Sequence, residues 1–356
     1  MSKRPAPESG RRSTVRDVAV RAGVSPSTVS RVLLGNYPVA ASTRSKVQRA
    51  MRELDYVVNA QARALSGSST RTVAFLIDNV TGAFYAHIAR GVEQQAKAEG
   101  RLCILCTTDG DRQQLYLLIE LMREQNADAV VIVGGAWEDS DYEQRMIHYA
   151  NALHRSGSRL VLVGRPPLAT DAPATVAEYD NEGGAYAITS HLLSAGHRRI
   201  AYLGAIPGFT TSTQRLRGFR MAHEMHGVEP DDMLIVPGDH SRSFGYQGAK
   251  RLLAGGARFT AILAATDVVA SGALLALREA GVRVPDDVAV AGYDDIPLAA
   301  DLYPALTTVR VPHEELGSAA VRLALNRDQH VGAQHVMLGT HVVVRDSAPS
   351  PGRGKA

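Results

Sequence analysis

The sequence predicts a small all-α head followed by a two-lobed α/β body made of doubly wound parallel sheets. Apolar residues recur at helical spacing through residues 13–58. From residue 72, short apolar runs of strand length alternate with amphipathic stretches of helix length, which is the pattern of parallel strands connected by helices. This alternation extends over about 270 residues, which is long for one such sheet and indicates two lobes.

Two short helices and a turn can be placed in the head from their capping residues. Thr14 is a suitable N-cap, and Gly23 ends the helix that follows it. Ser25 caps the next helix, Pro26 occupies its first position, and Gly35 stops it. Two helices joined by a short turn that contains glycine form the helix-turn-helix pattern of DNA-binding proteins.

The positive charge of the chain is concentrated in this head. Residues 1–72 carry 13 Lys and Arg against 4 Asp and Glu, whereas the remaining residues carry 26 against 32. A third helix, with Val47 and Leu54 on its apolar face, carries Arg44, Arg49 and Arg52 elsewhere. Alone, such a basic face indicates a solvated helix surface. Beside a helix-turn-helix, it favours contact with DNA phosphates.

Two segments, TVRDVAVRAGVSPSTVSRVL and VAASTRSKVQRAMRELDYVVNAQARALSG, carry a specific motif. They resemble the LacI/GalR family of bacterial transcriptional regulators over roughly residues 14–67. The resemblance implies that Pro26, Ser27 and Arg31 lie on a recognition helix that faces base edges in the major groove. Further residues at positions where the family contacts DNA or holds this helix are Thr14, Val15, Ser25, Thr28, Ser30, Thr43 and Arg44.

The head departs from the family at two positions and ends in a short helical segment. Leu34 stands where the family usually has Asn, and Ala40 where it often has Ser, so two hydrogen bonds are lost. Residues 59–66 form either a plain linker or, as the resemblance implies, a hinge helix that folds on DNA. In that hinge, Asn59, Ala62 and Leu65 contact DNA, and Leu65 inserts between base steps of the minor groove.

The body shows eight apolar runs of strand length, at residues 73–77, 102–106, 129–133, 159–164, 200–204, 233–238, 261–265 and 288–295. Two late runs, 306–311 and 341–345, are expected to cross back between lobes. Ligands of open α/β sheets bind beyond the carboxyl ends of the strands, so we expect a cleft between the lobes. The predicted division is a disordered basic tail (1–12), the head (13–58), hinge and linker (59–70), an N-lobe (about 71–168 and 299–328), a C-lobe (about 170–297 and 330–346) and a disordered tail (347–356).

The body also resembles the family, through GHRRIAYLG, QRLRGF, ATDVVASGALLALREAGVRVPDDVAVAGYDD and PALTTV. The resemblance implies the fold of periplasmic sugar-binding proteins and a small effector, expected to be a sugar, with a purine as the alternative. Candidate effector-binding residues are Phe84, Tyr85, Gly134, Arg165, Tyr179, Arg215, His240, Asp267 and Asp294. Phe84 and Tyr85 are alternatively helix-start packing residues, and Asp267 is alternatively a helix cap.

Signatures of common α/β enzymes are missing from the sequence. It contains no GxGxxG after a strand, no Walker A motif and no GxSxG. Cys103 and Cys106 are predicted to lie on opposite faces of one strand and therefore not to form a redox pair. No metal site and no cofactor are expected, and neither a signal peptide nor a membrane span is predicted.

We therefore expect a cytoplasmic, homodimeric repressor, not an enzyme, that binds a pseudo-palindromic operator in double-stranded DNA. The alternative is a sugar-binding receptor or sugar-processing enzyme with an incidental basic N-terminal tail.

Overall fold

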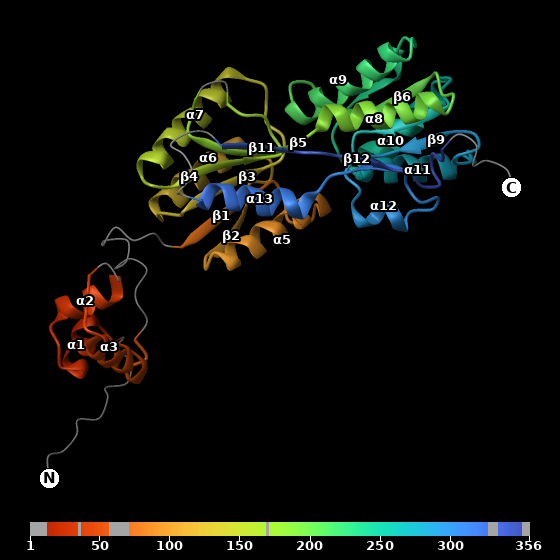
Figure 1. The fold of residues 1–356 in the computed structure, drawn as a ribbon. Coiled ribbons are helices and arrows are strands. Elements are labelled where there is room, and N and C mark those ends of the chain that lie inside the picture. Colours follow the sequence, from red (N-terminus) through yellow and green to blue (C-terminus); the bar gives the residue numbers. More distant parts are fainter. Residues whose placement is uncertain (1–12, 35–36, 57–70, 169–170, 327–333, 351–356) are drawn as a thin grey trace. The chain divides into compact units, whose positions relative to one another are not determined.

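The structure is a computed structural model that describes residues 13–34, 37–56, 71–168, 171–326 and 334–350. The chain divides into two compact units, Met1–Thr70 and Arg71–Ala356 (Figure 1). The predicted tail 1–12 and the predicted hinge residues Asn59, Ala62 and Leu65 lie outside the described residues.

The head contains three helices, α1 (Val15–Ala22), α2 (Pro26–Leu34) and α3 (Ala41–Glu53). Thr14 and Asp17 form a capping box at α1, and Gly23 ends this helix with a left-handed φ of 67°. At α2, the backbone N–H of Thr28 donates to the hydroxyl of Ser25 over 3.2 Å. The two predicted helices and the caps at Thr14, Gly23 and Ser25 are therefore confirmed, while the predicted stop at Gly35 lies outside the described residues.

Helix α3 begins without a side-chain cap. Its N-cap residue is Ala40, whose side chain accepts no hydrogen bond. Replacing Ala40 with Ser supplies an acceptor for an unpaired N–H of the first turn, so we expect the head to gain about 1 kcal/mol of unfolding free energy. Calorimetry of the full chain measures this as a higher melting temperature of the head. An Ala40→Val variant, which adds no acceptor and is as poor an N-cap as Ala, is the control, and equal melting of the Ser variant and the parent would contradict the assignment.

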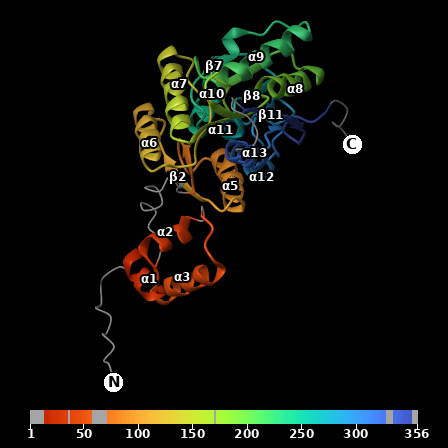
Figure 2. The same ribbon diagram turned by 60° about the vertical axis from the view of Figure 1, so that its left-hand side comes forward.

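The first lobe of the body is built on a parallel sheet in the order β11-β5-β4-β3-β1-β2. Its strands are β1 (Thr72–Ile77), β2 (Leu102–Thr107), β3 (Ala129–Val133), β4 (Arg159–Val163), β5 (Ala174–Tyr179) and β11 (Gln334–Leu338). Helices cover both faces: α5 (Ala83–Ala98) and α13 (His313–Leu325) on one, α6 (Arg112–Glu124) and α7 (Ser140–Arg155) on the other (Figure 2).

The second lobe repeats this architecture around a parallel sheet in the order β7-β6-β8-β9. Its strands are β6 (Ile200–Ala205), β7 (Ile235–Pro237), β8 (Ala261–Ala264) and β9 (Ala289–Ala291), and β10 (Thr308–Arg310) pairs separately with β12 (His341–Val343). Helices α8 (Asn181–Ser194) and α9 (Thr210–Met225) cover one face of the sheet, and α10 (Arg242–Ala254) and α11 (Asp267–Glu279) the other. Two short helices complete the lobe, η1 (Asp232–Leu234) and α12 (Pro297–Asp301).

The predicted lobe boundaries are wrong in three places. Strands β5 and β11, expected in the second lobe, pair with each other inside the sheet of the first lobe. Residues 299–310, expected in the first lobe, belong to the second, where β10 pairs with β12. Strand β5 was missed because its sequence, ATVAEY, is no apolar run: it contains Glu178, which is buried and lies 2.7 Å from His335 of β11.

The C-terminal tail is ordered further than predicted. Ser347 and Ala348, expected in a disordered segment, are 0 % and 2 % exposed. The Ser347 hydroxyl donates to the carbonyl of Val290, and the Ala348 carbonyl accepts from the hydroxyl of Thr307. These hydrogen bonds hold the segment against β9 and the residues preceding β10.

Candidate ligand cavity and DNA-binding head

A cavity of about 1000 Å³ lies at the carboxyl ends of strands from both lobes. This is where ligands bind in open α/β sheets, a relation called the strand-end rule below. Its lining includes eight of the predicted effector residues: Phe84, Tyr85, Gly134, Arg165, Tyr179, Arg215, His240 and Asp294. A cavity of this size is at the upper end of the range for small-molecule sites.

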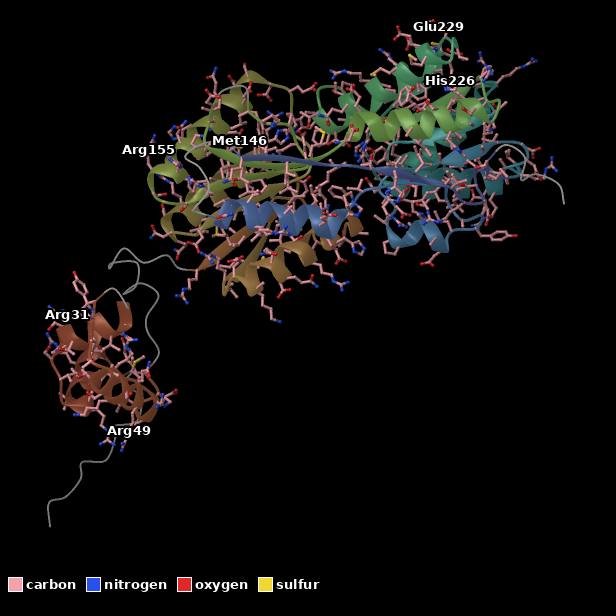
Figure 3. All side chains as sticks on the ribbon, viewed as in Figure 1. Arg31, Arg49, Met146, Arg155, His226 and Glu229 are labelled. Carbon is pink, nitrogen blue, oxygen red and sulfur yellow. The ribbon has the colours of Figure 1, made fainter. Side chains whose placement is uncertain are left out.

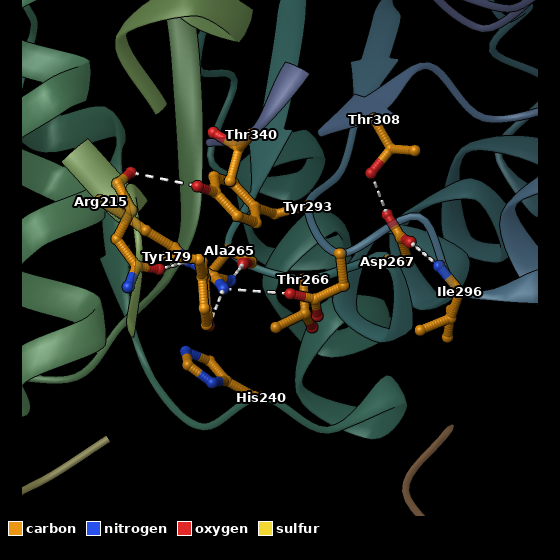
Figure 4. Close-up of polar contacts among 12 residues, drawn as sticks. Tyr179, Arg215, His240, Ala265, Thr266, Asp267, Tyr293, Ile296, Thr308 and Thr340 are labelled. Atoms are coloured by element: carbon orange, nitrogen blue, oxygen red, sulfur yellow. Dashed lines mark hydrogen bonds and ion pairs between the residues drawn. The ribbon is translucent and has the colours of Figure 1, made fainter. Parts of the chain in front are cut away.

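Arg215 is the centre of a buried polar cluster in this cavity (Figure 4). Its side chain, from α9, forms an ion pair with Asp294 over 3.0 Å and donates to the Tyr179 hydroxyl over 3.1 Å. Its Nε donates to Asn181 over 2.9 Å, and its guanidinium stacks 3.7 Å from the ring centre of Tyr293. Because Tyr179 ends a first-lobe strand and Arg215 lies in the second lobe, this cluster connects the two lobes.

Asp294 has an unusual backbone conformation and a raised pKa. Its backbone has a φ of 112°, which a non-glycine residue rarely adopts and which is typically found at functional sites. Burial raises the pKa of this carboxyl to about 6, although the Arg215 guanidinium acts in the opposite direction. Asp294 is therefore a buried carboxylate with a modest preference for its charged form at neutral pH.

Asp267 neither lines the cavity nor caps its helix, so both predicted roles are wrong. The carboxylate is fully buried, where it accepts from the hydroxyl of Thr308 and from the backbone N–H of Ile296 over 2.9 Å. The N-cap of α11 is Thr266, whose hydroxyl accepts from the Val269 N–H over 3.2 Å. Thr266, not Asp267, reaches the cavity. Asp267 instead fastens β10 and the segment before α12 to α11.

Phe84 and Tyr85 satisfy both of the interpretations left open by the sequence. They lie in the first turn of α5, pack against the core and also line the cavity. The Tyr85 hydroxyl donates to Asp78 over 2.9 Å, and the Phe84 ring lies 6.3 Å from that of Tyr179. The pair therefore forms an aromatic wall in the first lobe.

The His240 ring is neutral, and a hydrogen bond to the backbone fixes its orientation. Burial, together with the nearby Arg215 charge, lowers its pKa to about 4. Its Nε2 lies 3.2 Å from the carbonyl oxygen of Gly204. Since a carbonyl only accepts, Nε2 carries the proton, which leaves Nδ1 as an acceptor.

Arg165 is buried without a carboxylate partner among the described residues. Its Nε donates to the carbonyl of Gly134 over 2.7 Å and its Nη2 to that of Val133 over 3.2 Å, while Nη1 donates to the Tyr142 hydroxyl. These contacts use only part of its hydrogen-bonding capacity.

The sequence interpretation missed three aromatic residues of the cavity, Tyr142 of α7 and the two loop residues Trp137 and Phe209. Both loop residues lie in segments that follow a predicted strand, β3 and β6 respectively. The strand-end rule, applied to each strand in turn and not only to motif positions, would have identified them.

The residues of the head that are predicted to contact DNA bases are exposed to solvent. Pro26, Ser27 and Arg31 are exposed on α2, and Arg44 is exposed on α3. Arg31 and Arg49 both lie on the surface of this unit (Figure 3). The Arg31 guanidinium lies 5.6 Å from the centre of the Tyr37 ring, a cation–π contact that restrains it.

The two cysteines lie on opposite faces of β2, as predicted. Cys103 packs with one core layer of the first lobe and Cys106 with the other, and both are free thiols. Burial raises the pKa of both thiols, that of Cys103 to about 11.

The described ranges contain no group of three or more His, Cys, Asp or Glu side chains placed to hold a metal ion. No helix in these ranges combines the length and the apolar character needed to cross a membrane.

Comparisons with known proteins agree with this architecture. Residues 14–59 match the bacterial regulatory proteins of the lacI family, and residues 189–348 match the periplasmic binding protein-like domain. The chain is 33 % identical to the HTH-type transcriptional regulator DegA of Bacillus subtilis, over 94 % of this chain and 98 % of that protein. It is 32 % identical to the ribose operon repressor of Escherichia coli, over 88 % and 93 % of the two chains.

Solved structures resemble both units. A complex of the transcriptional regulator CelR with cellobiose has a TM-score of 0.70 at 32 % identity, covering 94 % of this chain and 100 % of that one. The lac repressor dimer bound to operator and the anti-inducer ONPF has a TM-score of 0.81 at 26 % identity, covering 96 % and 100 %. From its helix-turn-helix, its two-lobed body and these relatives, the chain belongs to the LacI family of bacterial transcriptional regulators.

Proposed function

We propose that this protein is a sequence-specific transcriptional repressor, not an enzyme, whose affinity for its operator is controlled by a small effector in the inter-lobe cavity. The observation that carries this proposal is the buried Arg215–Asp294 pair, which faces the cavity and contacts Tyr179 of the other lobe. A ligand at this position changes the free energy of one lobe arrangement relative to another. A DNA-binding protein of a bacterium acts in the cytoplasm, and we place the chain there.

The cavity chemistry favours a sugar as effector. A guanidinium donates in fixed geometry, and a carboxylate accepts from two neighbouring hydroxyls. Aromatic rings at Phe84, Tyr85 and Tyr179 suit the apolar face of a sugar ring. The names of two relatives, a cellobiose complex and a ribose operon repressor, point to the same class. A purine is the alternative.

The first lobe carries an apolar surface that fits a second copy of this chain. Leu102, Ile104 and Leu105 of β2 are 66 %, 37 % and 45 % exposed, and Leu117 and Leu121 of α6 are 65 % and 45 % exposed. Strand β2 is the edge of its sheet. Exposed apolar groups of this kind are typical of protein interfaces. A homodimer brings two heads to a pseudo-palindromic operator, as in the lac repressor dimer.

We expect Leu117→Asp to convert the dimer into a monomer, because it places a charge on the most exposed of these α6 side chains. Light scattering during gel filtration measures the mass directly. Met233→Asp changes an exposed side chain of the second lobe and should leave the mass unchanged. If the Leu117 variant stays dimeric at low micromolar concentration, the interface lies elsewhere.

The same proposal divides the predicted DNA contacts of the head into two groups. We assign base contacts to Pro26, Ser27 and Arg31, and phosphate contacts or helix support to the remaining head positions, Thr14, Val15, Ser25, Thr28, Ser30, Thr43 and Arg44. Asn59, Ala62 and Leu65, which lie outside the described residues, stay predicted DNA contacts.

We expect Arg31→Ala to lose about 1–3 kcal/mol of discrimination at one operator base pair, because Arg bonds guanine in bidentate fashion. Arg44→Ala should weaken binding to all sequences alike and lower the salt slope by about one. Competition binding against single-base operator variants separates the two effects. If the Arg31→Ala variant distinguishes the operator variants as well as the parent does, Arg31 does not contact a base.

Deletion of residues 1–66 distinguishes a repressor from a sugar receptor or enzyme. The remaining body is one compact unit. A repressor so shortened loses all operator binding and keeps sugar binding. A receptor or enzyme loses nothing, and its full-length form selects no DNA sequence from a random pool.

A further inference from the structure

A second aromatic group lines the cavity and shares no hydrogen bond with the Arg215–Asp294 pair. It consists of Trp137, Phe209 and Arg112. The Trp137 and Phe209 rings meet edge to face with centres 5.4 Å apart, and the Arg112 guanidinium lies 5.2 Å from the centre of the Trp137 ring. Arg112 is itself held by an ion pair with Asp139 over 2.6 Å. The indole is therefore oriented by its neighbours.

Trp137 nevertheless remains 39 % exposed and contributes to the cavity wall. An indole held in a fixed orientation but left partly uncovered gains stability when a flat apolar surface covers it. The apolar face of a sugar ring is such a surface. The Arg112 side chain beside it can donate to ring hydroxyls.

This group is built from both lobes. Trp137 lies between β3 and α7 of the first lobe, and Phe209 between β6 and α9 of the second. Their backbones form an antiparallel bridge, in which the Glu138 N–H donates to Gly208 and the Thr210 N–H to Ala136, each over 2.8 Å. A ligand that covers Trp137 therefore contacts the junction of the two lobes directly.

A row of rings connects this group to the Arg215 cluster. The Phe209 ring lies 6.5 Å from that of His240, which packs near Gly204 beside Arg215. Trp137, Phe209 and His240 thus line the cavity in sequence. Together with a volume of about 1000 Å³, this row provides room and stacking surface for more than one sugar ring.

We propose that Trp137, with Phe209 and Arg112, forms a second sugar subsite, so that the effector is a glycoside of two or more rings. This inference rests on the proposed function, because the first ring occupies the Arg215 site. Binding of the second ring to both lobes supplies the differential contact by which the ligand selects one lobe arrangement.

The single tryptophan of the chain makes this subsite directly observable. Intrinsic tryptophan fluorescence of the full-length protein reports only on Trp137. The probes are cellobiose, maltose and lactose, compared with glucose and galactose, and thermal shift measures binding at either subsite. We expect at least one disaccharide to raise the melting temperature and change Trp137 emission, and to bind at least tenfold more tightly than its component monosaccharides.

Variants of Trp137 test the role of the indole. Trp137→Ala should weaken that disaccharide about tenfold by calorimetry and leave monosaccharide affinity within about twofold. Trp137→Phe retains a ring and should restore most of the affinity. Val80→Ala, which changes an exposed side chain that does not line the cavity, is the matched control.

Each remaining outcome overturns a defined part of the account. If a monosaccharide binds as tightly as the disaccharides and leaves Trp137 emission unchanged, the second subsite is wrong and the sugar-responsive repressor stands. If Trp137→Ala binds the disaccharide normally, the subsite is also wrong. If none of the five sugars binds, both the subsite and the sugar effector are overturned.

Discussion

Asp294→Ala is expected to abolish sugar binding and to lower the free energy of unfolding of the body by about 3–5 kcal/mol. The stability loss follows from Arg215, which is 2 % exposed and has Asp294 as its carboxylate partner in the described part of the chain. Removing one partner of a buried ion pair leaves an uncompensated buried charge. Urea denaturation measures the stability, and calorimetry with the binding sugar measures the affinity.

Two comparisons separate binding from stability. Asp294→Asn preserves the shape of the side chain and its contact with Arg215, so it should lose less stability than the alanine variant while still weakening sugar binding. Asp295→Asn, at the neighbouring residue, removes the negative charge that pairs with Arg310 and Arg345, and Asp295 does not line this cavity. A sugar that binds Asp294→Ala as well as the parent would exclude the proposed site.

Lowering the pH from 7.5 to 5 is expected to weaken sugar binding about tenfold. The pKa of Asp294 is about 6 in the ligand-free protein, so its carboxylate is mostly protonated at pH 5 and loses acceptor capacity. His240, whose pKa is about 4, stays neutral throughout this range. Calorimetry at several pH values gives the profile, and the Asp294→Asn variant should show no such dependence.

The weaker sugar binding at pH 5 does not arise because protonation of Asp294 unfolds the protein. Folding raises the pKa of this carboxyl from 3.8 to about 6, so the folded state binds the proton more tightly than the unfolded state. The part of the stability that depends on the proton bound to Asp294 is therefore fully present below pH 3.8 and is lost as the pH rises through 6, whereas the ion pair with Arg215 is a separate contribution of the charged form. The melting temperature of the parent, compared with that of Asp294→Asn, checks this sign. An affinity that stays constant between pH 7.5 and 5 would show that the ligand does not require the charged carboxylate.

The head was predictable from the sequence because its signals are local. Thr14, Gly23, Ser25 and Pro26 each act on backbone groups within a few residues, and the structure places the helix boundaries beside them. The strands with continuous apolar runs were also correctly placed. Strands β3 and β6, for example, are buried on both faces, so their composition alone identifies them, whereas the edge strand β2 is largely exposed.

The lobe boundaries and the direction of the Asp267 side chain could not be predicted from local sequence signals. They depend on contacts between residues that lie far apart in the chain. The polar strand β5 takes its place through pairing with β11, which lies about 160 residues later. Asp267 sits at the position of a motif residue, but Thr308 and Ile296 turn its carboxylate away from the cavity. Ser347 is ordered for the same reason, through its contacts with Val290 and Thr307.

The most direct test of the account is the affinity of the full-length protein for DNA with and without bound sugar. A pseudo-palindromic operator is first selected from a random DNA pool, and fluorescence anisotropy then measures its dissociation constant at saturating disaccharide. The account predicts that the sugar changes this constant, and that operator DNA changes the sugar affinity by the same factor. A sugar that occupies the Arg215 site and leaves operator affinity unchanged would contradict it.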